Sequence, residues 1–323
     1  MKPRFIAPLL LACAGLLSGA NGALAQAYPN KPVRIITPYA AGSSVDAVAR
    51  IVGAPLSENL KQPVLVDPRP GANTVIGSEL MVKSPADGYT LLLISTTHVW
   101  NGLLVPNQPY DTIKDFAPVA TIASSELILV ASPNVPATNV RELAALGKTK
   151  ELTYATSSAG GPTHLAAELF RSMTGVKLEH IPYKGSGPAV TDLLGGYVDI
   201  GWTSPLSVIA HVNAGKLKGI AISGDARAPA LPQVPTFTES GLPGFDMRFW
   251  HALLAPAGTP RDILNRLSAE IAKILATQDM KEKLATQGAD PFINNPDQFA
   301  ALIRADMAKY GKIIKEASIK MAD

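Results

Sequence analysis

Short apolar runs alternate with longer amphipathic segments along most of the chain, and this alternation limits the possible folds more than any other feature. The run Val33–Thr37 is followed by a polar loop and, from Val45, by apolar residues at helical spacing. The same order returns from Leu152 onward. Such alternation predicts βα units around mostly parallel sheets. At about 150 residues per domain, 323 residues are enough for roughly two domains.

Two stretches depart from this alternation. Residues 225–244 carry four prolines and no regular spacing of apolar residues, which predicts an irregular connection. From Pro260 to Ile319 the apolar residues recur at helical spacing, so we expect the last third to be almost wholly helical. The sequence shows no repeat with a period of about 20 to 50 residues, which argues against a solenoid.

The first residues have the composition of a secretory leader. Lys2 and Arg4 precede an apolar run from Phe5 to Leu17, and Ala23-Leu24-Ala25 matches the small-residue pattern that signal peptidase cuts. The apolar run is too short for a good membrane span. We therefore expect residues 1–25 to be a signal peptide and the mature protein to be periplasmic.

The single cysteine, Cys13, lies inside this leader. The residues before it loosely resemble a lipoprotein cleavage site, which is an alternative to cleavage after Ala25. Cleavage at Cys13 would leave a very short apolar run, so the Ala25 site is preferred. The mature chain then has no cysteine, which excludes disulfides, thiol catalysis and cysteine-ligated metals.

Composition and motifs exclude several classes of function. The net charge is +3 at pH 7 with no Lys/Arg-rich block, so nucleic acid is not an expected partner. The chain lacks the nucleophile elbow G-x-S-x-G, the phosphate loop G-x-x-x-x-G-K and the dinucleotide fingerprint G-x-G-x-x-G. Its five histidines show no metal-ligand spacing. We therefore expect no metal, no cofactor and no enzymatic activity.

Polar loops follow several of the expected strands. The loops Tyr39–Asp46 and Thr156–Thr163 are rich in Gly, Ser and Thr, and each opens an expected helix. Backbone N–H groups at a helix N-terminus, with nearby hydroxyls, bind an anion without a fixed cation. Ser95–His98 and Trp202–Ser204 are two further polar strand ends, and open α/β folds bind ligands at this edge of the sheet. For any one loop, ordinary helix capping is the preferred explanation, but the matched pair favours a binding site.

Motifs spread over the whole mature chain resemble those of one receptor family. They include Tyr28-Pro29-Asn30-Lys31-Pro32-Val33, Pro38-Tyr39 with Gly42, Asp46 and Ala49-Arg50, Pro70-Gly71-Ala72-Asn73, Ala86-Asp87-Gly88-Tyr89, Pro182-Tyr183-Lys184-Gly185 and Ala255-Pro256-Ala257-Gly258. This set is similar to the extracytoplasmic solute receptors of tripartite tricarboxylate transporters, also called Bug or TctC-like receptors. The resemblance implies a two-lobed, type II-like α/β periplasmic binding protein fold, each lobe a mostly parallel sheet flanked by helices. It also implies a small organic carboxylate as ligand, membrane permease subunits as partners and a monomeric receptor.

In that fold, residues 26–125 and 248–323 form one lobe and residues 126–247 form the other. The cleft between them is expected to bind the ligand through the polar loops, their neighbours and aromatic side chains. These residues are Tyr39, Ala41, Gly42, Ser43, Ser44, Asp46, Ser95, Thr96, Thr97, His98, Ser157, Ser158, Gly160, Gly161, Thr163, His164, Tyr183, Trp202, Thr203 and Ser204. For Asp46, a structural cap together with a helix-surface ion pair to Arg50 is the slightly favoured interpretation.

Several alternatives stay open from the sequence. The first loop has Gly42-Ser43 where the family usually has two glycines, and Thr203-Ser204 stands where it often has an acidic or amide residue. Aliphatic and aromatic carboxylates are therefore both candidate ligands, and sensing is not separable from transport. The competing hypothesis is an exported hydrolase that uses a loop serine, which requires a base within reach of that serine.

Overall fold

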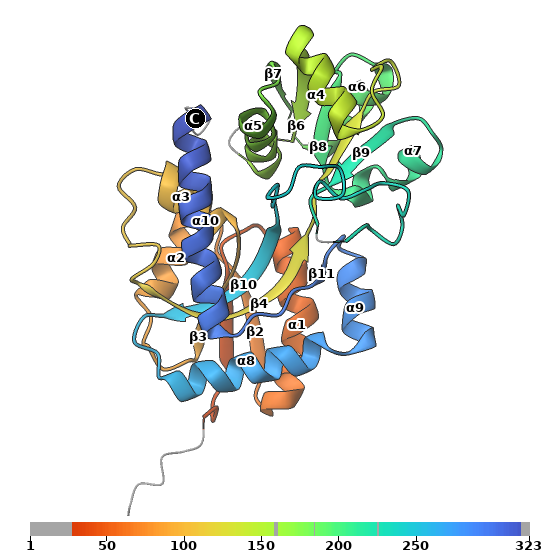
Figure 1. The fold of residues 1–323 in the computed structure, drawn as a ribbon. Helices are drawn as coiled ribbons and strands as arrows, with labels where there is room; N and C mark the ends of the chain where they lie inside the picture. Colours follow the sequence, from red (N-terminus) through yellow and green to blue (C-terminus); the bar gives the residue numbers. More distant parts are fainter. Residues whose placement is uncertain (1–27, 158–160, 184, 225, 318–323) are drawn as a thin grey trace, which may run out of the picture.

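The computed structural model describes residues 28–157, 161–183, 185–224 and 226–317, which form two α/β lobes joined by two connecting segments (Figure 1). The expected signal peptide, Cys13, Ser158 and Gly160 lie outside the described residues. Within the described part, no helix combines the length and the hydropathy needed to cross a membrane.

Lobe 1 is built on a six-stranded sheet with the strand order β11-β4-β10-β3-β1-β2. Its strands are β1 (Val33–Thr37), β2 (Val64–Pro68), β3 (Thr90–Ser95), β4 (Phe116–Ser125), β10 (Phe249–Pro256) and β11 (Asp290–Pro291). Its helices are α1 (Ser44–Leu60), α2 (Val75–Val82), α3 (Thr97–Leu104), α8 (Arg261–Leu275), α9 (Gln278–Ala285) and α10 (Pro296–Ala317), with a short 3-10 turn at Ala72–Thr74.

Lobe 2 is built on a five-stranded sheet with the strand order β7-β6-β8-β5-β9. Its strands are β5 (Ile128–Ala131), β6 (Leu152–Thr156), β7 (Leu178–Pro182), β8 (Ile200–Thr203) and β9 (Lys218–Ile222). Its helices are α4 (Val140–Thr149), α5 (Pro162–Thr174), α6 (Ser186–Gly195) and α7 (Ile209–Asn213), with a 3-10 turn at Pro205–Ser207. Helix α10 of lobe 1 also packs against α5, so it contacts both lobes.

The expected two-lobed α/β fold is confirmed, with one difference in strand direction. Both sheets are mixed rather than mostly parallel: β1 pairs in parallel with β2 and β3, and β6 with β7 and β8, but β10 and β5 run antiparallel to their neighbours. The physical reason is the route of the chain. Because β5 and β10 each enter a sheet from the other lobe, no βα crossover sets their direction.

Two elements beside the cleft are not predicted by the sequence pattern. The run Phe249–Pro256 forms β10, a central strand whose two faces are both buried, so its residues are apolar almost throughout and do not alternate. The polar cluster after β3 starts helix α3 at Thr97 instead of continuing as a loop. The described residues of 226–244 contain neither a helix nor a regular strand, as the prolines predict.

Helix α1 illustrates how apolar spacing builds lobe 1. Val45, Val48, Val52 and Leu56 recur at intervals of three and four residues, and each is at most 3% exposed. They pack in one cluster with residues of the sheet and of α8. Burial of a Val or Leu side chain contributes about 1.5–3 kcal/mol. This packing fixes the N-terminus of α1 at the end of β1, where Ser44 faces the other lobe.

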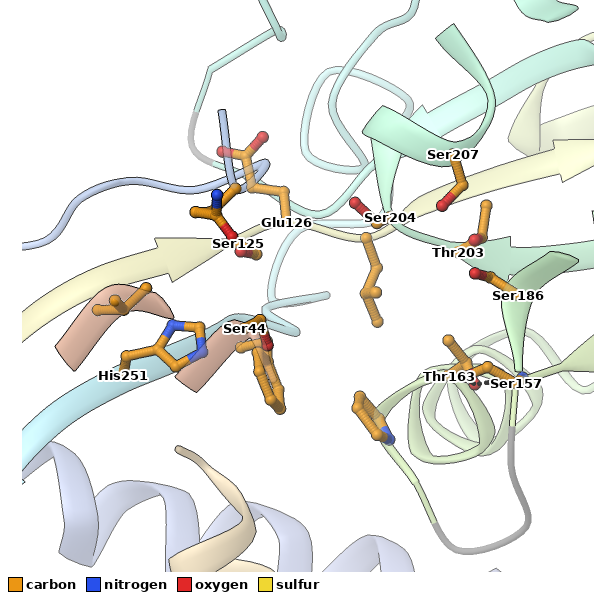
Figure 2. A pocket seen from close by; sticks show the side chains of 15 residues that line it. Ser44, Ser125, Glu126, Ser157, Thr163, Ser186, Thr203, Ser204, Ser207 and His251 are labelled. Atoms are coloured by element: carbon orange, nitrogen blue, oxygen red, sulfur yellow. Dashed lines mark hydrogen bonds between the residues drawn. The ribbon is translucent and has the colours of Figure 1, made fainter. Parts of the chain in front are cut away.

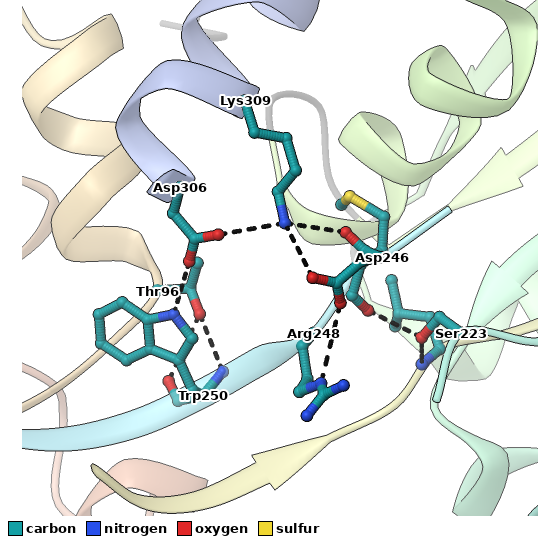
Figure 3. A network of polar contacts seen from close by, with 9 residues as sticks. Thr96, Ser223, Asp246, Arg248, Trp250, Asp306 and Lys309 are labelled. Atoms are coloured by element: carbon teal, nitrogen blue, oxygen red, sulfur yellow. Dashed lines mark hydrogen bonds and ion pairs between the residues drawn. The ribbon is translucent and has the colours of Figure 1, made fainter. Parts of the chain in front are cut away.

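Polar contacts hold the returning segment in place (Figure 3). The Ser223 hydroxyl accepts the Leu127 N–H at 2.9 Å and donates to the Met247 carbonyl at 2.7 Å, so it ties the two connecting segments together. The Trp250 indole N–H of β10 donates to the buried Asp306 carboxylate of α10 at 2.9 Å. This bond holds the Trp250 side chain on the face of the sheet that packs against α10. Because side chains alternate along a strand, the residues on either side of Trp250 lie on the opposite face.

Candidate functional site

A cavity of about 270 Å³ lies between the two lobes, where several strands of both sheets end (Figure 2). Lobe 1 lines it with Ser44, Val48, Ser125, Phe249, His251 and Gln287. Lobe 2 lines it with Ser157, Pro162, Thr163, Ser186, Thr203, Ser204 and Ser207. Glu126 and Leu127, from the first connecting segment, complete the lining.

The lining is rich in hydroxyl groups and poor in charge. Eight of its residues are Ser or Thr, and no Lys or Arg occurs among the lining residues of the described ranges. Glu126 supplies a carboxylate and His251 an imidazole. Among the described residues, the cavity therefore offers a polar ligand hydroxyls and backbone dipoles rather than a side-chain cation.

Two helices of lobe 2 direct their N-termini at the cavity. Helix α5 begins at Pro162 and α6 at Ser186, and both residues belong to the lining. The N-cap residues are Gly161 and Gly185, and neither makes a side-chain capping hydrogen bond. Since the first N–H groups of a helix and its dipole favour negative charge, these two ends form a surface suited to an anion.

The strand ends of β6 and β8 meet in the same wall. The Ser157 N–H donates to the Thr163 hydroxyl oxygen at 3.2 Å, and the Gly185 N–H donates to the Ser157 carbonyl at 2.9 Å. Thr203 and Ser204 follow from the neighbouring strand β8, and the hydroxyl of Thr203 is buried without a hydrogen-bond partner in the described residues. The structure thus brings the two polar strand ends of lobe 2 together.

The first predicted loop is arranged differently. The Ser43 hydroxyl accepts the Asp46 N–H at 3.2 Å, and the Asp46 carboxylate accepts the Gly42 N–H at 2.9 Å and pairs with Arg50. Burial alone would raise the pKa of Asp46, but the hydrogen bonds from Arg50 and from the Gly42 N–H outweigh it and lower that pKa. Ser44 is the member of this loop that lines the cavity, while Ala41 and Gly42 are exposed outside it.

The polar cluster after β3 is bonded within lobe 1 and does not line the cavity. The Ser95 hydroxyl bonds to the Tyr39 hydroxyl at 2.7 Å and to the Thr97 hydroxyl at 2.9 Å. The buried Thr96 hydroxyl accepts the backbone N–H of Trp250. This cluster therefore braces β3, the loop after β1 and β10 against one another beside the cavity.

His98, from the same predicted set, also lies away from the cavity. Its Nε2 bonds to the Thr112 carbonyl at 2.9 Å, and its ring packs edge-on to Phe116. Burial lowers the pKa of His98 to about 4, so the ring is neutral at pH 7. These contacts are those of a structural histidine.

Three further predicted residues of lobe 2 also lie outside the lining. Trp202 is 2% exposed and packs among the aromatic rings of the lobe 2 core. The Tyr183 hydroxyl donates to Asp192 at 2.7 Å, and burial together with that carboxylate raises the pKa of Tyr183 to about 12. His164 stacks on His180 with ring centroids 4.0 Å apart.

Sequence reasoning missed several lining residues, of which His251 is chemically the most distinctive. His251 lies on β10, the strand that the pattern did not reveal, and is 3% exposed. Neither of its ring nitrogens has a hydrogen-bond partner among the described residues, and burial lowers its pKa to about 4. Ser125 and Glu126 could have been predicted as lining residues, because they form a polar break between two apolar strands.

A hydrolytic site would require a base bonded to one of these serines. The imidazole of His251 bonds to no hydroxyl of the described residues, so it is not paired with a lining serine there as the base of a catalytic triad is. Within the described ranges, no three His, Cys, Asp or Glu side chains are grouped as a metal site requires.

Two α/β lobes around a cavity of hydroxyls and helix N-termini define the class of periplasmic solute-binding proteins. Residues 48–319 match the family described as "Tripartite tricarboxylate transporter family receptor", and the chain belongs to that family. This confirms the resemblance found in the motifs. The family consists of solute receptors rather than enzymes.

Individual relatives agree along nearly the whole chain. Protein BugT of Bordetella pertussis is 37% identical over 317 residues, which cover 97% of this chain and 96% of that protein. The structure of an R. palustris protein with adipate is 32% identical, with a TM-score of 0.73 over 91% of this chain and all of that chain. MatC from Rhodopseudomonas palustris, solved with bound malate, is 28% identical, with a TM-score of 0.66 over 89% of this chain and all of that chain.

Proposed function

We propose that this protein captures a small organic carboxylate in the cavity between its lobes and delivers it to the membrane permease of a tripartite tricarboxylate-type transporter. The observation that carries the proposal is the pair of helices, α5 and α6, whose N-termini reach the cavity without a side-chain cap. Their N–H groups and dipoles attract one carboxylate, and the surrounding hydroxyls donate further hydrogen bonds.

The relatives support a carboxylate as the ligand. One similar structure contains adipate and another contains malate, and both ligands are aliphatic acids. The lining of this chain suits the same chemistry, because its many hydroxyls can solvate a carboxylate, and the described lining residues include no Lys or Arg of the kind that a site of higher charge would use.

Closure of the lobes completes the proposed cycle. We take residues 26–125 with 248–323 as one moving body and residues 126–247 as the other, with the two connecting segments as the hinge. Closure excludes water, so the hydrogen bonds between the ligand and the lining become stronger. The leader at residues 1–25 would export the chain to the periplasm, where it acts as a monomer.

A ligand screen on the mature chain tests this function. Aliphatic and aromatic carboxylates, each matched with its uncharged amide, are added singly and the melting temperature is recorded. A ligand at 100 times its Kd stabilises the folded state by about 2.7 kcal/mol, which gives a clear shift. We expect at least one acid, and not its amide, to produce that shift. If every acid fails and the protein hydrolyses a model ester, the receptor function is wrong.

A further inference from the structure

The imidazole of His251 is a polar group placed in the cavity without any partner from the described residues. It is 3% exposed and lines the cavity, yet neither Nδ1 nor Nε2 has a hydrogen bond to any residue that the structure describes. Buried polar groups are nearly always hydrogen-bonded, and an exception in a native fold calls for a specific explanation. In a cavity, the simplest explanation is a ligand group that supplies the missing bonds.

The sheet fixes the direction of this ring. Trp250 is anchored on one face of β10 by its bond to Asp306, so its neighbours Phe249 and His251 point to the other face, toward the cavity. The register of β10 on β4 shifts between His251 and Ala252, and such irregularities re-aim side chains next to binding sites. The Phe249 ring meets the imidazole edge-on, with centroids 5.3 Å apart.

The groups around the imidazole define what it can bind. Its low pKa keeps it neutral at pH 7, with one nitrogen as donor and the other as acceptor. The Glu126 carboxylate lines the same cavity, whereas no Lys or Arg does within the described residues. A ligand carboxylate can pair only with the ring nitrogen that carries the proton. A hydroxyl can pair with whichever ring nitrogen faces it, as acceptor or as donor, and adds no charge beside the Glu126 carboxylate.

Figure 2 shows His251 on the lobe 1 side of the cavity and Thr163 and Ser186 on the lobe 2 side. The two sides therefore differ in chemistry: helix N-termini that suit an anion face a neutral imidazole that suits a hydroxyl. Thr203, on the lobe 2 wall, is a second buried hydroxyl without a partner in the described part of the chain. A ligand with a polar group at each end would satisfy both walls.

We propose that His251 is a ligand-binding, specificity-determining residue that hydrogen-bonds a hydroxyl group at the end of the ligand remote from its carboxylate. This inference rests on the proposed carboxylate-receptor function. It assigns the carboxylate to lobe 2 and the second polar group to lobe 1, so the receptor selects a hydroxylated acid over the unsubstituted acid of equal length.

Calorimetric titration with two six-carbon acids, hexanoate and 6-hydroxyhexanoate, tests the assignment. In the wild-type protein we expect 6-hydroxyhexanoate to bind about tenfold more tightly than hexanoate, as one hydrogen bond to a buried group implies. His251→Phe keeps the ring but removes both nitrogens, and should bring this ratio to about one. His251→Gln keeps a donor and an acceptor and should restore part of it. His211→Phe, on α7 outside the cavity lining, is the matched control.

The outcomes separate this inference from the function on which it rests. If acids bind but the wild-type ratio is one, or if His251→Phe leaves the ratio unchanged, the role of His251 is wrong while the receptor function stands. If no acid in this set or in the wider screen binds the wild-type protein, the proposed function itself fails. Should His251→Phe not fold, ¹⁵N spectra of wild-type histidines decide. The His251 signals should move with 6-hydroxyhexanoate and stay nearly unchanged with hexanoate, and equal movement with both acids would overturn the assignment.

Discussion

The N-terminus of α1 in lobe 1 and those of α5 and α6 in lobe 2 follow the same local pattern of strand, polar loop and helix, yet they differ in what pairs with their first N–H groups. In lobe 1, the Ser43 hydroxyl caps α1 by accepting the Asp46 N–H, and the Asp46 carboxylate accepts a hydrogen bond from the Gly42 N–H. In lobe 2, glycine stands at the N-caps of both α5 and α6, and no described side chain caps either helix. A helix N-terminus is therefore open to an external anion only where the loop supplies no acceptor of its own.

The histidines of the two lobes differ in a similar way. His98 and His251 in lobe 1 are 1% and 3% exposed, whereas His164 and His180 in lobe 2 stack on each other and are only partly buried. Lobe 1 thus encloses these two histidines, whereas His164 and His180 of lobe 2 keep part of their surface accessible. Each of the following experiments tests one side of this contrast.

Lowering the pH should have the largest effect, because it destabilises the folded state through the buried histidines. Burial lowers the pKa of His98 from 6.5 to about 4 in the folded protein. Between these values the unfolded chain binds a proton that the folded chain does not, so the free energy of unfolding falls as the pH falls from 6.5 to 4. At 1.4 kcal/mol per pKa unit, one fully buried histidine lowers the free energy of unfolding by roughly 3 kcal/mol over this pH range. Urea denaturation at pH 6.5, 5.5 and 4.5 measures the loss.

Two variants assign this loss to a lobe. Burial and the neighbouring His164 lower the pKa of His180 to about 4 as well. Because the ring of His180 is partly exposed, solvent should weaken this shift, so His98→Gln should flatten the pH dependence more than His180→Gln. Asp306, whose pKa is raised by burial, acts in the opposite direction and is unchanged in both variants. Greater flattening by His180→Gln would show that lobe 2 encloses its histidines at least as fully as lobe 1.

A carboxylate placed at the open N-terminus of α6 should have the next largest effect. Ser186→Asp puts a negative charge where the ligand carboxylate is proposed to bind, so we expect at least a hundredfold loss of affinity, or about 2.7 kcal/mol. Titration calorimetry with an acid found in the screen measures it. Thr191→Asp makes the same change on an exposed position of the same helix and should leave the affinity within a factor of about three. Equal losses in both variants would place the anion elsewhere.

Removal of the cap in lobe 1 should have the smallest effect, and mainly on stability. Ser43→Ala removes the hydroxyl that accepts the Asp46 N–H, which should cost about 1 kcal/mol in the free energy of unfolding. Its effect on ligand affinity should be far smaller than that of Ser186→Asp, because this helix end is filled by its own loop. A larger loss of affinity than of stability would mean that the ligand carboxylate lies on lobe 1 instead.

Part of the candidate site could be predicted from residues that are adjacent in sequence. Ser44, Ser157, Thr163, Thr203 and Ser204 all follow apolar runs, and strand ends of one sheet meet at one edge, so their presence in the cavity lining follows from local pattern. The same reasoning included the neighbours of these residues without telling which way they point. Trp202, next to Thr203 on β8, turns into the core because side chains alternate along a strand.

His251 shows why the remainder was out of reach. Its strand pairs with β3 and β4, and His251 lies opposite Ser95, a residue more than 150 positions earlier in the chain. From an apolar run such as Phe249–Pro256, neither the neighbouring strands nor the face that lines the cleft can be predicted.

The sequence by itself determined the α/β class, the family and the polar loops, because periodicity, glycine and hydroxyl residues act through local backbone geometry. Only the tertiary structure decided which loops face the cleft and which loops use their own side chains to accept hydrogen bonds at the start of the helix. It also decided that a neutral histidine from a late strand would stand opposite the open helices of lobe 2. The physical reason is that strand register and the meeting of two lobes depend on contacts between residues far apart in the chain.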